Sequence, residues 1–157
     1  MINELMIDIE TTGQKPGCKV LSIGAFGFDN KGTQTEFYRK FSIAAQNGAD
    51  FKLWFLKNFS SSQNDALRVW CCGVDFDFPI LKHFFEVYGF SFPWNFWNQY
   101  DYRTVKNLFG ISKKDENNSG KHNALEDAKA QMRGLRCFYN RNLRINKSAL
   151  SGGNSNG

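Results

Sequence analysis

The chain has 157 residues, of which 41% are hydrophobic and 16% aromatic, and it carries a net charge of +5. This is enough apolar material for one buried core, which excludes wholesale disorder, and the length fits a single domain. No run of about 18 apolar residues suits a transmembrane helix, and the acidic start MINELMIDIE does not suit a signal peptide. We therefore expect a soluble, cytoplasmic protein.

The charge is unevenly distributed along the chain. Residues 1–102 hold 9 Lys and Arg against 11 Asp and Glu, a net of −2, whereas residues 103–157 hold 11 against 4, a net of +7. A basic half suits a polyanionic partner such as nucleic acid, although most charge runs are only solvated surfaces. The four cysteines show no CxxC spacing, so we expect reduced thiols rather than a zinc or disulfide framework.

The first part of the chain predicts a β-meander followed by a helix. The segments 4–9, 19–28 and 33–41 read as strands, and the short connections between them favour antiparallel pairing. Residues 50–59 then predict a short helix with Asp50 as its N-cap.

The second part alternates strands with helices. The apolar run 66–73 ends in glycine and predicts a buried central strand. It is followed by a helix over 76–89, a short strand at 97–101, a helix near 104–108, a polar loop at 111–121 and a helix over 123–141 capped by Asn123. The domain should end near residue 145, with 146–157 as a flexible tail. This order predicts an α/β fold with a mixed five-stranded sheet, an antiparallel meander plus parallel strands, flanked by helices.

Acidic residues gather near two of the predicted strands. Asp8 and Glu10 lie two residues apart on the first strand, so strand periodicity puts both on one face. Such a pair is costly unless a cation joins it, or unless the strand lies at an edge and both acids are solvated. Asp77 follows the buried strand, and it would join them if that strand pairs in parallel with the first. Asp75 is a rival for this position, and a helix N-cap role would explain either residue.

The start of the last helix carries a third group of polar residues. A Lys-, Gly- and Asn-containing loop presents His122, and Asp127 follows on the small-residue side of the helix that should face the sheet, near Gln131. An acid on that side needs a partner. A role at the positive helix N-terminus does not account for Asp127, because Glu126 already suits that role. Along the chain the motifs read DxE, then D, then HxxxxD.

With these motifs the chain resembles the DEDD-type 3′→5′ exonucleases of the DEDDh branch, which have the RNase H-like fold. The motifs are IDIETTG, GVDFDFPIL and HNALEDA, and the likeness covers roughly residues 4–135. Within that superfamily the chain is most similar to small phage DexA-like and RNase AS-like exonucleases, through the runs VLSIGAFGFD and FPWNFWNQYDYRT. It departs from them between Phe59 and Ala66, where relatives usually carry a longer helical stretch.

The resemblance implies that Asp8, Glu10, Asp77 and Asp127 are metal-binding carboxylates and that His122 is the general base. Phosphodiester hydrolysis needs charge neutralisation and an activated water, which two divalent ions supply, and oxygen ligands favour Mg²⁺ or Mn²⁺ over zinc. A histidine can take the proton of the attacking water. The implied reaction releases nucleoside 5′-monophosphates from the 3′ end of single-stranded RNA or DNA.

Four further residues are expected to contact the substrate: Thr11, Trp97, Arg103 and Lys121. Arg103 suits a phosphate group, but pairing with Asp101 explains it equally well. The aromatic run that holds Trp94, Phe96 and Trp97 either stacks on bases or belongs to the core.

Two other functions stay open. A catalytically silent nucleic-acid-binding module is favoured by the shortened segment and the basic half, but such a module has no use for clustered buried acids. Endonucleolytic cleavage of the RNase H kind is disfavoured by the HxxxxD motif. The expected partner is single-stranded or 3′-overhang RNA or DNA, with no membrane, and a homodimer is an option.

Overall fold

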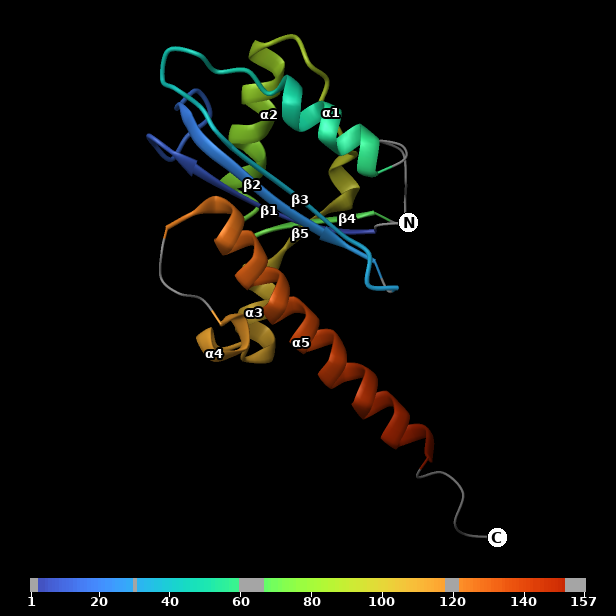
Figure 1. Ribbon diagram of the computed structural model, residues 1–157. Coiled ribbons are helices and arrows are strands. Elements are labelled where there is room, and N and C mark those ends of the chain that lie inside the picture. Colours follow the sequence, from blue (N-terminus) through green and yellow to red (C-terminus); the bar gives the residue numbers. More distant parts are fainter. Residues whose placement is uncertain (1–2, 30, 60–66, 118–121, 152–157) are drawn as a thin grey trace, which may run out of the picture.

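The computed structural model describes residues 3–29, 31–59, 67–117 and 122–151 (Figure 1). Its strands are β1 (Glu4–Thr11), β2 (Val20–Phe28), β3 (Gln34–Lys40), β4 (Arg68–Cys71) and β5 (Gln99–Asp101). Its helices are α1 (Ala49–Asn58), α2 (Asp77–Val87), α3 (Tyr102–Phe109), α4 (Lys113–Glu116) and α5 (Ala124–Ser151), with a 3-10 turn at Phe96–Asn98. Figure 1 shows α1 and α2 on one face of the sheet and the other helices on the opposite face.

The sheet has five strands in the order β3-β2-β1-β4-β5. β1, β2 and β3 pair antiparallel, whereas β4 is parallel to β1 and β5 is parallel to β4. The predicted meander and the parallel pairing of β4 with β1 are therefore confirmed. This mixed sheet flanked by helices is consistent with an RNase H-like fold.

The alternation of side chains along β1 separates two hydrophobic cores. Leu5, Ile7 and Ile9 lie in the aromatic-rich core beneath α1 and α2. Met6 lies in the smaller core on the opposite face, with residues of α3 and α5. Because successive residues of a strand point to opposite faces, the even-numbered residues of β1 face α5. Because of this alternation, the acids of β1 lie on the side of the sheet that faces α5.

Helix α5 starts in direct contact with the sheet, over Gly24 of β2. A Cβ atom on Gly24 would lie 2.1 Å from the backbone carbon of Ala124 and 2.1 Å from the backbone nitrogen of Leu125. Gly24 is paired with Asp8 across the sheet. The missing side chain therefore lets the beginning of α5 lie close to the acid-bearing part of β1.

The substitution Gly24→Ala is expected to destabilise the fold. The added methyl group collides with backbone atoms, which cannot rotate away as a side chain can, so the cost should be at least about 2 kcal/mol. Urea unfolding followed by circular dichroism measures this free energy. An unchanged unfolding midpoint would mean that α5 does not approach β2 as closely as described.

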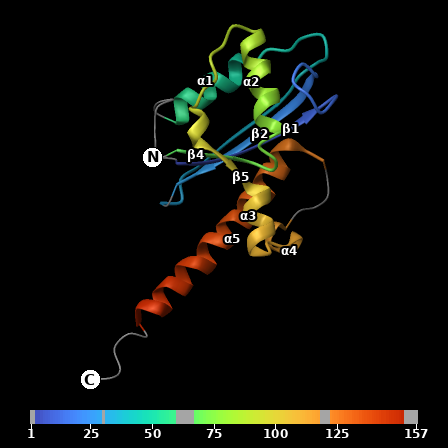
Figure 2. The same ribbon diagram turned by 180° about the vertical axis from the view of Figure 1, so that it is seen from behind.

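A short helix replaces part of the predicted loop 111–121. Ser112 and Asp115 form a capping box at the start of α4, in which each side chain bonds the backbone N–H of the other. The buried carboxylate of Glu116 accepts hydrogen bonds from the Tyr102 hydroxyl at 2.9 Å and from the Lys106 ammonium at 2.6 Å. These bonds hold α4 beside α3, and Figure 2 shows both helices next to α5 from behind.

The start of α1 and the end of α5 differ from those predicted. The N-cap of α1 is Gly48, so the prediction of Asp50 is wrong; Asp50 lies in the first turn, where an acid still favours the helix dipole. Helix α5 continues to Ser151, beyond the end predicted at residue 141. Residues 152–157, and residues 60–66 of the shortened segment, lie outside the described residues. No helix in the described ranges is long and apolar enough to cross a membrane.

Candidate active site

Three of the predicted site acids meet at one end of the sheet. Asp8 and Glu10 are half-buried even-numbered residues of β1. Asp77 is the first residue of α2, which follows β4, and its side chain is only 3% exposed. Because β4 runs parallel to β1, the ends of both strands lie at the same edge, where ligand sites of α/β proteins gather.

The fourth acid comes from the start of α5. Asn123 caps this helix, and its Oδ1 accepts hydrogen bonds from the N–H groups of Leu125 at 3.1 Å and Glu126 at 3.2 Å. The Asn123 N–H in turn donates to Asp127 Oδ2 at 3.1 Å. The helix start is therefore ordered by reciprocal bonds that fix the Asp127 carboxylate.

Glu10, His122 and Asp127 form a group able to hold a metal ion. One potential ligand atom from each lies within 4.8 Å of the other two. The residues come from β1, from the segment before α5 and from α5 itself, and His122 is exposed. The fold thus brings together residues separated by more than a hundred positions in the sequence, as the motif interpretation predicted.

Gln131 joins α5 to Asp8 and was not predicted as a site residue. Its Nε2 donates a hydrogen bond to Asp8 Oδ1 at 2.9 Å. Its Oε1 is buried and, within the described part of the chain, has no hydrogen-bond partner. The sequence signal was its spacing of four residues from Asp127, which places both side chains on one face of the helix.

The pKa of Asp8 reflects both its burial and the acids around it. Burial raises this pKa well above its usual value, and the negative charges of Asp77, Asp127 and Glu10 raise it further. The hydrogen bond from Gln131 opposes the shift. All four predicted acids therefore belong to one electrostatic cluster, with an excess of negative charge that a divalent cation would offset.

Asp77 also has a raised pKa, again chiefly because it is buried. Burial raises the pKa of this carboxyl to about 7, against hydrogen bonds from the Cys71 thiol and the Ile9 backbone N–H, which lower it. Asp75, its rival in the sequence, is exposed and lines a neighbouring pocket. The buried member of the pair is therefore the one that lies with the other acids.

These pKa shifts predict a stability that falls with rising pH. Both carboxyls have a higher pKa in the folded than in the unfolded chain, so the folded chain binds more protons between about pH 4 and pH 7, and stability is lost as pH rises through this window. In EDTA, we expect the Tm at about pH 8 to lie roughly 5–10 °C below that at about pH 5.

Thermal melts of the wild-type chain and Asp77→Asn test this account. The asparagine does not titrate, so its Tm should vary less with pH, and Mg²⁺ should raise the wild-type Tm most at high pH, where protons no longer compete. A wild-type Tm that falls no more between about pH 5 and pH 8 than that of Asp77→Asn would contradict it.

Arg103 and Asp101 flank the cluster but do not form the ion pair considered from the sequence. Within the described residues, Arg103 Nη2 donates to the Cys72 carbonyl at 2.6 Å, while Asp101 caps α3 by accepting bonds from the Thr104 N–H and hydroxyl. The guanidinium lies against Gly73, where a Cβ atom would be 2.9 Å from Nη2. Arg103 and Asp101 both line a pocket of about 440 Å³. The guanidinium thus faces a pocket at the end of β4.

The remaining substrate candidates have different surroundings. The Thr11 hydroxyl donates to the Gly13 carbonyl at 2.6 Å at the end of β1. Trp94 is buried in the core, whereas Phe96 and Trp97 are 77% and 55% exposed. Lys121 lies outside the described residues. Only part of the aromatic run is therefore core.

Comparison with known proteins agrees with this geometry. The family model of the 3′-5′ exoribonuclease Rv2179c-like domain matches residues 3–58 and 48–138, a range that contains all four acids and His122. No curated protein matches the chain. Because the two matched segments together span most of the sequence, the chain belongs to the Rv2179c-like 3′-5′ exoribonuclease domain family.

Proposed function

We propose that this protein is a metal-dependent 3′→5′ exonuclease of the DEDDh type that removes nucleoside 5′-monophosphates from single-stranded RNA. The observation that carries the proposal is the convergence of Asp8, Glu10, Asp77 and Asp127, with His122 beside them, at one end of β1 and β4. Membership of an exoribonuclease domain family supports RNA as the substrate.

The donor set fits divalent metal ions. Its carboxylate oxygens are hard ligands, and burial has raised the pKa of two of them, so the site gains from a cation that replaces the protons. Bound there, two Mg²⁺ or Mn²⁺ ions would supply charge neutralisation for the phosphodiester and activation of a water. Asp8, Glu10, Asp77 and Asp127 are the residues that would hold them.

His122 is proposed as the general base. It is exposed at the edge of the cluster, where it can reach a water beside the scissile phosphate, and it lies with Glu10 and Asp127. A positioned histidine that takes the proton of the attacking water contributes typically about 10²–10⁴ in rate. Arg103 is proposed to bind a phosphate of the strand, because its guanidinium is held at the pocket beside Asp77.

Gln131 should act on the metal site through Asp8. Replacing it with Met keeps the side-chain length but removes the hydrogen bond to Asp8 Oδ1, so the carboxylate loses its orientation. We expect Mn²⁺ affinity to fall about 10-fold or more, as is usual when a group that orients a ligand is lost. Isothermal titration calorimetry measures this, with Gln34→Met on β3 as the control; equal affinities would exclude a positioning role.

Product analysis tests the proposed function. The chain is incubated with single-stranded RNA and with DNA of the same sequence, in Mg²⁺, Mn²⁺ or EDTA, and nucleotides are separated by chromatography. The proposal predicts 5′-monophosphates from RNA in the presence of either metal and none in EDTA. Tight RNA binding without any released nucleotide would favour a silent binding module.

A further inference from the structure

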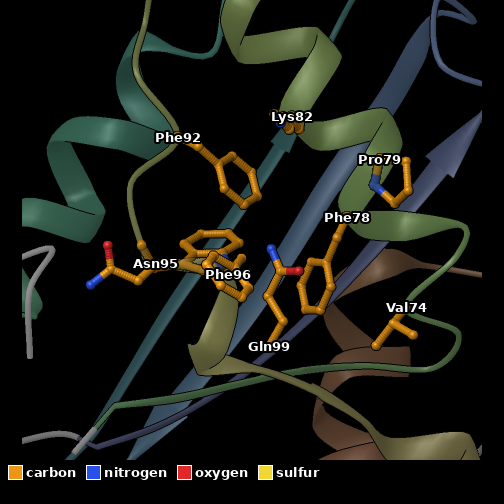
Figure 3. Close-up of a pocket in the computed structure, with 9 residues that line it drawn as sticks. Val74, Phe78, Pro79, Lys82, Phe92, Asn95, Phe96 and Gln99 are labelled. Atoms are coloured by element: carbon orange, nitrogen blue, oxygen red, sulfur yellow. The ribbon is translucent and has the colours of Figure 1, made fainter. Parts of the chain in front are cut away.

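A second pocket, of about 450 Å³, opens between α2 and the segment that precedes β5 (Figure 3). Aromatic rings make up much of its wall, from Phe78 on α2 and from Phe92, Trp94 and Phe96. A volume of this size falls in the range of small-ligand sites. The four acids do not line it, so it is distinct from the metal-binding cluster.

The position of this aromatic pocket links it to the candidate active site. Phe78 directly follows Asp77, and Val74 lines both the aromatic pocket and the pocket of Arg103. The acid cluster, the Arg103 guanidinium and the aromatic rings therefore follow one another across the end of β4. A polymer with alternating phosphates and flat bases could occupy such a series of sites.

Unused hydrogen-bonding groups distinguish this pocket from a purely apolar one. Figure 3 shows the Gln99 side chain extending among the aromatic rings, and within the described residues its carboxamide makes no hydrogen bond. A carboxamide offers both donors and an acceptor, so its place among aromatic rings favours a ligand that has polar atoms as well as an apolar face.

Exposure and charge point to a nucleic-acid strand as the occupant. Phe96 leaves 77% of its surface exposed, although a large aromatic side chain is usually covered. Lys82 lines the same pocket, and Arg103 lies in the next one, so cations accompany the rings. Aromatic faces with neighbouring cations are the combination that binds single-stranded nucleic acids.

We propose that the aromatic pocket binds a nucleobase of the RNA strand, with stacking on Phe96 and hydrogen bonding to Gln99. This inference rests on the proposed function, which supplies the strand, and it adds a subsite that senses the base rather than the phosphate. A base has a π-face for the ring and a polar edge for the carboxamide, so both kinds of wall group find a partner.

Abasic RNA gives a direct test. Binding of 5′-fluorescent 12-mers, intact or with a single abasic ribose at each of the last four positions, is measured by anisotropy. The protein carries His122→Ala, so that the strands bind to intact acids and are hardly shortened. At one position we expect base removal to weaken binding of the strand about tenfold. Phe96→Ala should weaken binding of the intact strand by the same factor, but it should not weaken binding of the strand that is abasic at that position.

Two further variants complete the cycle. Phe96→Tyr should bind as the wild type does, and Leu108→Ala, at an equally exposed residue of α3, should weaken neither strand. The inference would be overturned if the effects of Phe96→Ala and of base removal were additive at every position. It would also be overturned if the intact strand did not bind. A chain that shows the predicted coupling but never shortens RNA would contradict the proposed function alone.

Discussion

Replacing Asp127 with Asn is expected to lower the rate of RNA shortening about a thousandfold or more. The asparagine keeps the size and the bond from the Asn123 N–H, but it removes a charge from the cluster that surrounds Asp8. A loss of several kcal/mol of charge stabilisation corresponds to this factor, since about 1.4 kcal/mol changes a rate tenfold. Initial rates on 5′-labelled RNA at saturating Mn²⁺ measure the effect.

Asp75→Asn is the matched control for this substitution. It removes the same charge two residues before Asp77, but Asp75 is exposed, lines the pocket of Arg103 rather than the acid cluster, and is absent from the interactions that shift the pKa of Asp8. We expect a rate within about twofold of the wild type, in line with the small effects of surface substitutions. If Asp75→Asn lost as much activity as Asp127→Asn, the assignment of the acids would be wrong.

Replacing His122 with Ala is expected to lower the rate by about 10²–10⁴ without a comparable loss of Mn²⁺ affinity. A general base acts on the water, whereas the carboxylates hold the metal, so the two measurements should separate. The rate is taken from the same RNA assay and the affinity from calorimetry. His83→Ala replaces the chain's other histidine, which is exposed, and should change neither the rate nor the Mn²⁺ affinity.

The outcome for His122 also distinguishes two roles. A ring nitrogen of this histidine lies within 4.8 Å of carboxylate oxygens of Glu10 and Asp127, so it is placed to bind the same ion as well as to act as a base. A parallel loss of rate and of Mn²⁺ affinity would identify it as a ligand and would contradict its proposed role in proton transfer.

The alternation in β1 explains why much of the fold could be predicted. Strand periodicity placed Asp8 and Glu10 on one face, and the apolar run before Gly73 indicated a buried strand, which is β4. The convergence of Asp77 with them depended on parallel pairing, which the sequence predicted only as a condition and which the structure confirms. Local sequence patterns thus predicted the strands, whereas the convergence of the acids depended on how these strands pair.

What could not be predicted depends on contacts between distant segments. The bond from Gln131 to Asp8 requires α5 to cross β1, and this crossing depends on the absence of a side chain at Gly24. The aromatic pocket combines α2 with residues 92–99, and the sequence alone did not separate buried Trp94 from exposed Phe96. Helix α4 starts at a local capping box of Ser112 and Asp115, but its place beside α3 depends on bonds from Tyr102 and Lys106 that no local pattern shows.

The polarity of RNA degradation tests the central claim most directly. A single-stranded RNA labelled at its 5′ end, and the same RNA labelled at its 3′ end, are followed over time on a sequencing gel with Mn²⁺. The account predicts that the 5′-labelled strand gives a ladder of products that shorten one nucleotide at a time from the 3′ end. It also predicts that the 3′-labelled strand releases labelled mononucleotide immediately. Neither is expected in EDTA. Internal fragments, release from the 5′ end, or unchanged degradation in EDTA would contradict it.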